Sequence, residues 1–225
     1  MMSASLRSAA NLYEIFGENE MLLSIRSTSS GLTLSKIEGS IRAKVIFHSM
    51  EQTKTPEVEC VLNALNFIIP TLQKYNFKWV ITGGFASLVH GVNRSLTDID
   101  IDINTSRNST EFKNFLKDVE QFTTQPLEHF VDQNYDNYNV EISYEGQVLD
   151  ICPMAEMNIF DKLSGKYENF YKDGFPEIEF VDFHGLELTL LSKELIIKNK
   201  EMLVWQRESD HRDVAGLREL LEANS

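Results

Sequence analysis

The spacing of apolar residues predicts the first elements of a folded domain. Between residues 58 and 75 these residues recur at steps of three and four, which places them on one face of a helix. They are Val58, Val61, Leu62, Leu65, Ile69, Leu72 and Tyr75. The short apolar tract 78–82 then ends at Gly83-Gly84. We therefore expect a helix, a buried strand that ends in a glycine turn, and a second helix over residues 85–90.

Residues 97–103 alternate between polar and apolar positions, which predicts a β-strand. Three aspartates share one face of this strand and three isoleucines share the other: Asp98, Asp100 and Asp102 against Ile99, Ile101 and Ile103. The isoleucines are expected to face the core.

The later part of the chain predicts helices mixed with strands. We expect a helix over 112–119 capped by Asn108 or Ser109, a loop over 121–138, and two strands, 140–144 and 147–151, joined by a tight turn at Glu145-Gly146. Strands over 178–183 and 186–190 precede two C-terminal helices, which begin at the caps Ser192 and Ser209. The fold class is therefore α/β (α+β), with a mixed β-sheet flanked by helices.

The 225 residues favour one domain with an appendage. Residues 1–55 are rich in Ser and Thr and form an N-terminal extension of unknown role, while residues 56–225 form the domain with its C-terminal helices. Within the extension, 21–25 and 41–47 are candidate strands, but no periodicity is long enough to exclude helix or disorder.

Composition narrows the classes of partner. The 21 Lys and Arg against 34 Asp and Glu give a net charge of −13, which disfavours a broad nucleic-acid-binding face. The two cysteines, Cys60 and Cys152, form neither a disulfide framework nor a zinc motif, so a reducing, cytoplasmic setting is expected. No apolar run is long enough to span a membrane.

The three aspartates of one strand face are the first candidate for chemistry. At a spacing of ~7 Å, neighbouring carboxylates repel each other by about 2 kcal/mol. Bound divalent cations relieve this repulsion, and Mg²⁺ prefers hard carboxylate oxygens. An exposed strand edge with solvated charges explains the same pattern equally well.

The glycine turn adds a second candidate. A helix that starts directly after Gly83-Gly84 presents unpaired backbone N–H groups, at which a phosphate binds readily. Arg94 lies between this turn and the acidic strand and is a candidate phosphate ligand.

These segments together resemble a known family. Thr82-Gly83-Gly84-Phe85-Ala86, His90-Gly91, Arg94 and Asp98-Ile99-Asp100-Ile101 are similar to the signature of the DNA polymerase beta-type nucleotidyltransferase superfamily. The closest resemblance is to the small bacterial group of lincosamide nucleotidyltransferases and abortive-infection toxin-antitoxin nucleotidyltransferases. It covers roughly residues 57–215 and is sharp over residues 80–103.

The resemblance implies a role for each matching position. Asp98, Asp100 and Asp150 would be the catalytic carboxylates and would bind two Mg²⁺ ions. Gly83, Gly84, Arg94 and Lys198 would bind the nucleotide, an NTP that serves as donor substrate. Asp102 matches no role in the family.

Two further observations concern acidic residues. A turn at Glu145-Gly146 pairs Glu141 with Asp150 on one face, where Glu141 is either a base or a solvated charge. The segment Arg207-x-x-Asp210-x-x-Asp213 loosely resembles a cluster of the same family, and helical salt bridges explain it equally well.

The resulting hypothesis is a Mg²⁺-dependent nucleotidyltransferase that transfers a nucleoside monophosphate from an NTP to an acceptor hydroxyl, with pyrophosphate release. The acceptor is a small molecule, a protein or RNA, and the net charge favours a small, cationic acceptor. The alternatives are a toxin-antitoxin component that acts through a protein partner and a non-catalytic nucleotide-binding module. Binding of an NTP without pyrophosphate release would identify the last.

Overall fold

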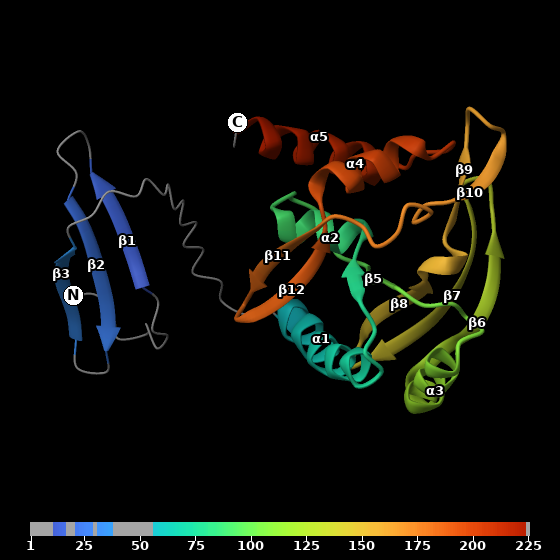
Figure 1. The fold of residues 1–225 in the computed structure, drawn as a ribbon, viewed down its shortest axis with the longest axis horizontal. Coiled ribbons are helices and arrows are strands. Elements are labelled where there is room, and N and C mark those ends of the chain that lie inside the picture. Colours follow the sequence, from blue (N-terminus) through green and yellow to red (C-terminus); the bar gives the residue numbers. More distant parts are fainter. Residues whose placement is uncertain (1–10, 17–20, 29–30, 38–55, 224–225) are drawn as a thin grey trace. The chain divides into compact units, whose positions relative to one another are not determined.

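The computed structural model describes residues 11–16, 21–28, 31–37 and 56–223. The chain divides into two compact units, residues 1–53 and 54–225. In the first unit, β1 (Asn11–Phe16), β2 (Met21–Thr28) and β3 (Gly31–Ile37) form an antiparallel sheet with β2 in the middle (Figure 1). The candidate strand 21–25 is part of β2, and the candidate strand 41–47 lies outside the described residues.

The second unit is built on one mixed sheet. Its order is β10-β9-β7-β8-β5-β4-β12-β11, and β6 pairs with β7. The strands are β4 (Trp79–Ile81), β5 (Asp98–Ile103), β6 (Thr123–Val131), β7 (Tyr135–Tyr144), β8 (Gln147–Pro153), β9 (Asn158–Asp161), β10 (Lys166–Asn169), β11 (Ile178–Phe183) and β12 (Leu186–Leu191). The pairs β5–β8 and β4–β12 are parallel, and the other pairs are antiparallel.

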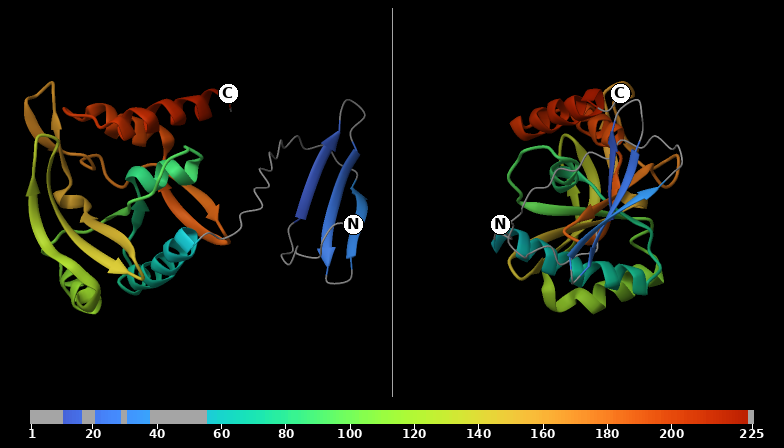
Figure 2. Two further views of the ribbon diagram at one scale, coloured as in Figure 1. Left: turned by 180° about the vertical axis from the view of Figure 1, so that it is seen from behind. Right: turned by 90° about the vertical axis from the view of Figure 1, so that its left-hand side faces the viewer.

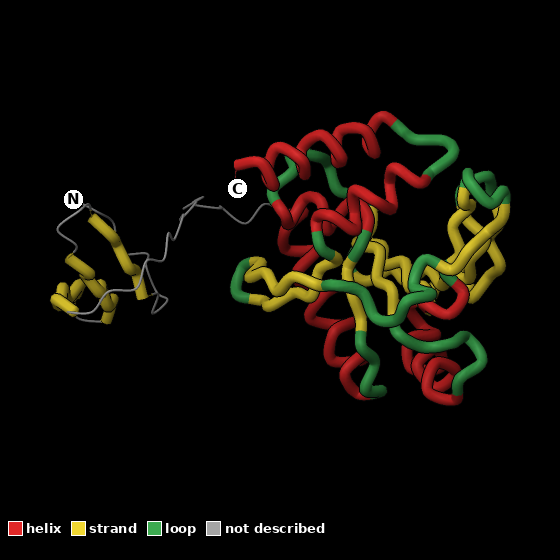
Figure 3. The backbone as a smooth tube through the Cα atoms, turned by 45° about the horizontal axis from the view of Figure 1, so that its top comes forward, coloured by secondary structure: helices red, strands yellow, loops and turns green. Residues whose placement is uncertain are grey.

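Helices flank this sheet on two sides. They are α1 (Pro56–Lys74), α2 (Gly83–His90), α3 (Thr110–Val119), α4 (Lys193–Met202) and α5 (Glu208–Ala223). Figures 2 and 3 show α1 and α3 on one side of the strands and the pair α4 and α5 on the other. The expected mixed sheet flanked by helices, with helices at the C-terminal end, is confirmed.

The core lies where the sequence pattern predicts it. Ile99, Ile101 and Ile103 of β5 are fully buried, as are Leu65 and Leu72 on the apolar face of α1. Each buried side chain of this size contributes about 1.5–3 kcal/mol relative to an exposed one. This burial fixes which face of β5 looks inward, so Asp98 and Asp100 lie on the opposite face.

The hairpin between β7 and β8 has the predicted register. Tyr144 pairs with Gln147 and Glu141 pairs with Asp150. Glu145 and Gly146 have φ angles of +47° and +87°, as a two-residue turn with both central residues in the left-handed region requires. The turn therefore sets the position of Asp150 in the sheet.

Two expectations about secondary structure are wrong, and a third, the Ser192 cap, holds for its position alone. Residues 121–138 are mostly strand, because they include all of β6 and the start of β7. The side chains of β6 are largely exposed on both faces and its pairing is irregular, so it shows no apolar alternation. Ser192 holds the N-cap position of α4 without a side-chain capping bond, and Ser209 lies inside α5. Ser109 does cap α3, because its hydroxyl accepts from the Phe112 N–H at 3.1 Å.

None of the helices in the described part of the chain has the length and apolar character needed to span a bilayer.

Candidate functional site

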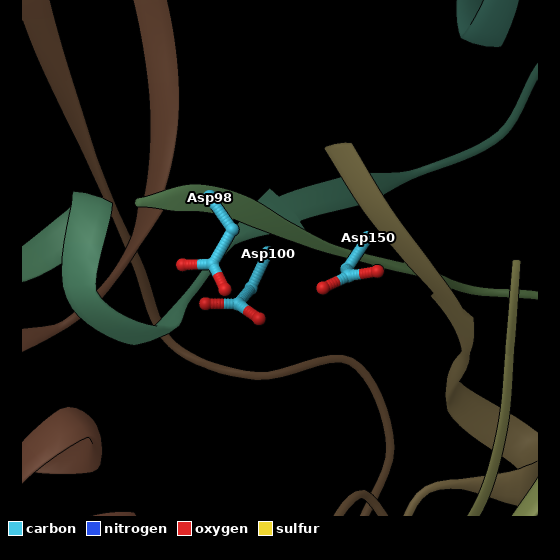
Figure 4. A group of neighbouring side chains, drawn as sticks. All are labelled: Asp98, Asp100 and Asp150. Carbon is cyan, nitrogen blue, oxygen red and sulfur yellow. The ribbon is translucent and has the colours of Figure 1, made fainter. Parts of the chain in front are cut away.

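Three carboxylates meet at one place on the sheet. Asp98 and Asp100 belong to β5 and Asp150 to the parallel neighbour β8, and the register places Asp100 directly beside Asp150. One oxygen of each carboxylate lies within 4.8 Å of the others. Figure 4 shows the three side chains turned toward one another from the two strands. Alternation along β5 and pairing across to β8 are together sufficient to build this cluster.

The environment opposes the ionised form of two of these groups. Burial, together with the charge of Asp98, raises the pKa of Asp100 to about 6. Burial and the charges of Asp100, Asp98 and Glu141 raise the pKa of Asp150 to about 7. A carboxylate cluster that repels itself in this way is electrostatically suited to a cation.

Asp102 is separate from the cluster and is not a solvated charge. It is 2 % exposed, and its carboxylate accepts a hydrogen bond from the Tyr171 hydroxyl. Burial raises its pKa to about 7, while the Tyr171 hydrogen bond acts in the opposite direction. The third aspartate of the strand is therefore buried against Tyr171 and is not a member of the cluster.

The glycine turn directly contacts the acidic cluster. Gly83 has a φ angle of +61°, and a Cβ atom built on it would lie 1.8 Å from the Asp100 Oδ2 atom. A Cβ atom on Gly84 would lie 2.4 Å from the Arg94 guanidinium. A side chain at either position must therefore displace the neighbouring carboxylate or guanidinium, and Gly83 favours glycine for its backbone conformation as well.

The same turn begins helix α2. Thr82 occupies the N-cap position and makes no side-chain capping bond, so its hydroxyl does not satisfy the first N–H groups of the helix. The Thr82 N–H itself donates to the Asp100 carbonyl at 2.9 Å, which ties the turn to β5. The arrangement places the positive end of a helix beside the carboxylates.

A cavity of about 320 Å³ opens beside these groups. It is lined by Gly83, Gly84, Arg94, Asp98 and Asp100 from the predicted site, and also by Lys200 and Arg207. The side chain of Lys198 is exposed and does not line this cavity. Helix α4 instead brings Lys200, two positions further along, to the site.

Buried ion pairs hold the basic groups in place. The Asp213 Oδ2 atom accepts from Arg94 Nη1 at 2.5 Å and lies 2.9 Å from Lys200 Nζ. Lys200 Nζ also donates to Asp210 Oδ1 at 2.8 Å, and Asp210 in turn pairs with Arg207. Burial acts to raise the pKa of Asp210, but the hydrogen bonds from Arg207 and Lys200 outweigh it and hold that pKa well below its usual range. Helices α4 and α5 thus fix the cations that face the cavity.

Glu141 lies opposite Asp150, as the hairpin register predicts. Its carboxylate accepts hydrogen bonds from the Thr124 hydroxyl and, at 3.2 Å, from the Gln125 amide. It still adds to the negative potential that raises the Asp150 pKa.

A second, smaller cavity of about 170 Å³ adjoins the first and shares five lining residues with it: Thr82, Asp100, Phe130, Asn137 and Met157. Asp150, Asp102 and Asn139 line it, and Asp100 borders both cavities. Each cavity therefore reaches part of the cluster, Asp98 and Asp100 in the larger one and Asp100 and Asp150 in the smaller one.

Sequence reasoning missed several residues of the site. Lys200 gave no signal, because a lysine in a helix is ordinarily solvated. Asn134, Tyr135 and Asn137 line the larger cavity but lie in the tract expected to be a loop. The concentration of polar residues over 132–137 could have indicated that this segment contributes to the site, since functional groups concentrate in connecting segments.

Comparison with known proteins gives structural neighbours only. No protein-family model matches the chain, and a search of curated proteins finds no match. A proposed nucleotidyltransferase from Thermotoga maritima is 18 % identical, with 79 % of this chain and 94 % of that chain covered at a TM-score of 0.49.

Two further solved structures are also similar. The lincosamide antibiotic adenylyltransferase LnuA, with lincomycin bound, is 16 % identical, with 69 % of this chain and 95 % of that chain covered at a TM-score of 0.46. ANT(2'')-Ia, in complex with adenylyl-2''-tobramycin, is 18 % identical, with 76 % of this chain and 92 % of that chain covered at a TM-score of 0.46. These neighbours are nucleotidyltransferases, the superfamily that the sequence resembles.

Proposed function

We propose that this chain is a metal-dependent nucleotidyltransferase that transfers a nucleoside monophosphate from an NTP to an acceptor hydroxyl. The observation that carries the proposal is the carboxylate cluster, with one oxygen from each of Asp98, Asp100 and Asp150 within 4.8 Å of the others. It stands beside the glycine turn of α2, and its members Asp98 and Asp100 line one cavity with Arg94 and Lys200. Acidic oxygens for cations and N–H groups for phosphates thus occur together.

The charges around the cavity fit a bound cation. Among the described residues, three cationic side chains and four carboxylates line it: Arg94, Lys200 and Arg207 against Asp98, Asp100, Asp132 and Asp210. A triphosphate adds further negative charge, which this lining does not neutralise. Hard carboxylate oxygens are the ligands that Mg²⁺ prefers. In our proposal Asp98, Asp100 and Asp150 hold two Mg²⁺ ions.

The remaining residues position the donor. The first N–H groups of α2, at Gly83 and Gly84, bind phosphate oxygens, and Arg94 and Lys200 neutralise their charge. In our proposal Lys200 takes the role that the family resemblance implied for Lys198. Arg94 and Lys200 need no reorganisation, because Asp213 already fixes both.

The transfer forms a bond between the acceptor oxygen and the α-phosphorus and breaks the bond from that phosphorus to the oxygen that bridges to the β-phosphate. Pyrophosphate leaves, and the proton of the acceptor hydroxyl passes to water. Bound Mg²⁺ would lower the pKa of that hydroxyl and stabilise charge on the phosphates. The smaller cavity beside Asp150 is the side from which we expect the acceptor to approach.

The acceptor class follows from charge. A chain of net charge −13 repels a polyanion, so we propose a small molecule ahead of RNA.

Cys60 and Cys152 are free thiols in the structure, in keeping with the cytoplasmic setting that we propose.

The test uses the full chain with Mg²⁺ and one α-³²P-labelled NTP at a time, in the presence of small cationic alcohols, proteins or RNA. We expect a labelled acceptor and an equal amount of pyrophosphate with one acceptor class. Asp98→Asn and Asp100→Asn should lower this activity by at least about a hundredfold while leaving the fold intact. Asp173→Asn, an exposed aspartate outside the site, is the matched control.

Two outcomes count against the proposal. Equal pyrophosphate release by wild type and both variants would show that the cluster takes no part. Binding of an NTP with no release in the presence of any acceptor would favour a nucleotide-binding module instead.

A further inference from the structure

An exposed tryptophan stands at the larger cavity. Trp205 lies in the connection between α4 and α5, is 55 % exposed and lines the same cavity as Gly83, Arg94 and Lys200. Figure 3 shows this connection reaching beyond both helices toward the β9–β10 hairpin. The exposure leaves a large aromatic surface at the cavity available for contact with a ligand.

The position of Trp205 is fixed through its backbone. The Asn134 side chain donates to the Trp205 carbonyl at 2.9 Å and accepts from the Trp205 N–H at 3.0 Å. Asn134 is itself 4 % exposed, and its own N–H donates to Asp132 at 2.8 Å. A buried amide therefore fixes the backbone that carries the exposed indole, which lowers the cost of ordering this residue on binding.

The cavity also presents an unmatched polar atom. Asn137 lines it, and the Asn137 Oδ1 atom is buried with no hydrogen-bond partner among the described residues. A ligand that carries an N–H or O–H group would satisfy this atom. The cavity thus combines an aromatic surface, a free hydrogen-bonding position and cations for phosphates.

We propose that Trp205 is the platform on which the base of the donor nucleotide stacks. The proposal rests on the proposed function, since it takes an NTP as the occupant of the cavity. Trp205 lines the cavity that holds the phosphate-binding groups and does not line the smaller cavity beside Asp150. Its occupant is therefore the donor rather than the acceptor. Stacking on an aromatic face suits any base, because each base has a π surface.

The experiment measures binding of the full chain with Mg²⁺ to the α,β-methylene analogues of the four NTPs, which are not cleaved, and to inorganic tripolyphosphate, which has no base. We expect Trp205→Ala to lower the affinity for the analogues by about tenfold. Its affinity for tripolyphosphate should stay at the wild-type value. Trp205→Phe, which keeps an aromatic face, should retain affinity for the analogues to within about threefold.

Intrinsic fluorescence gives a second readout. The chain has two tryptophans, Trp79 in β4 and Trp205. Stacking should quench the emission in wild type and in the matched control Trp79→Phe, and the quenching should vanish in Trp205→Phe.

The outcomes separate the two proposals. Unchanged affinity of Trp205→Ala for the analogues, with binding still lost in Asp98→Asn, would overturn the platform and leave the nucleotidyltransferase proposal standing. An equal loss for the analogues and for tripolyphosphate would also overturn it, because the tryptophan would then affect the site as a whole. Failure of wild type to bind any analogue would overturn both.

Discussion

Gly83 and Asp100 are in such close contact that no side chain fits between them: a Cβ atom on residue 83 would lie 1.8 Å from the Asp100 Oδ2 atom. The glycine turn and the acidic strand are therefore one steric unit. The turn therefore ends in contact with the Asp100 carboxylate. This places the proposed phosphate-binding N–H groups beside the proposed metal site.

Gly83→Ala should abolish activity for this steric reason. The new methyl group must displace the Asp100 carboxylate, and we expect transfer to fall by at least about a hundredfold. The free energy of unfolding should fall by about 1 kcal/mol from the backbone conformation alone. Transfer assays and urea unfolding measure the two effects.

Gly165→Ala is the matched control. Gly165 has a φ angle of +68°, close to the +61° of Gly83, and no atom lies within 4 Å of a Cβ built on it. It should show the loss of stability without the loss of activity. Similar activity in both variants would contradict a steric role for Gly83.

The raised pKa of Asp100 should make the metal-free protein less stable as the pH increases. Its pKa of about 6 in the folded chain exceeds its ordinary value of 3.8, so between these values the folded chain holds a proton that the unfolded chain has lost. The free energy of unfolding therefore falls as the pH rises through this window and stays low above it. The penalty at pH 7.5 is about 2–3 kcal/mol.

Asp100→Asn should remove this penalty. In EDTA at pH 7.5 we expect the variant to have a higher Tm than wild type, and at pH 4 the two should converge. Thermal unfolding at a series of pH values tests both points. A variant that is less stable than wild type at pH 7.5 would contradict the account of electrostatic strain in the cluster.

Mg²⁺ should reverse the same penalty in wild type. A cation at the cluster favours the ionised carboxylates, so addition of Mg²⁺ at about ten times its dissociation constant should add about 1.4 kcal/mol of stability. For a chain of this size we expect the Tm to rise by about 3–6 °C. The shift should be absent in Asp98→Asn and unchanged in Asp173→Asn. A shift of equal size in all three proteins would indicate binding elsewhere.

The local pattern along β5 predicted that Asp98 and Asp100 share one face, and the β7–β8 hairpin predicted the register of Asp150, but only the family resemblance assigned Asp150 to the same cluster. Alternation fixed which side of β5 carries Asp98 and Asp100, and a two-residue turn fixed Asp150 relative to its partner strand. Both arguments depend on backbone geometry over a few residues, and sequence records such geometry directly.

The remaining residues depend on contacts between distant segments. Lys198 and Lys200 lie on the same helix, and only the packing of α4 against α5 decides that Lys200 faces the cavity. Asn134 and Trp205 are 71 positions apart and meet through two hydrogen bonds. Strand β6 was missed because its exposed faces show no apolar alternation.

Asp213→Asn should both destabilise the fold and weaken phosphate binding. Asp213 is fully buried and pairs with Arg94 and Lys200, so the neutral amide leaves two cations poorly compensated. Loss of a buried partner of this kind costs about 3–5 kcal/mol, which urea unfolding measures. Since Arg94 loses its anchor beside Gly84, the affinity for tripolyphosphate should also fall.

Glu168→Gln provides the comparison, because the pair Lys172–Glu168 lies at the surface, with Lys172 Nζ 2.7 Å from Glu168 Oε2. Loss of this ion pair should lower the free energy of unfolding by less than about 1 kcal/mol and leave tripolyphosphate binding unchanged. If Asp213→Asn lost as little stability as Glu168→Gln, solvent would have to reach the ion pairs around Lys200. The fixed positions of Arg94 and Lys200 would then need another cause. A large loss of stability without a change in tripolyphosphate affinity would separate the two roles, and would assign Asp213 to the fold alone.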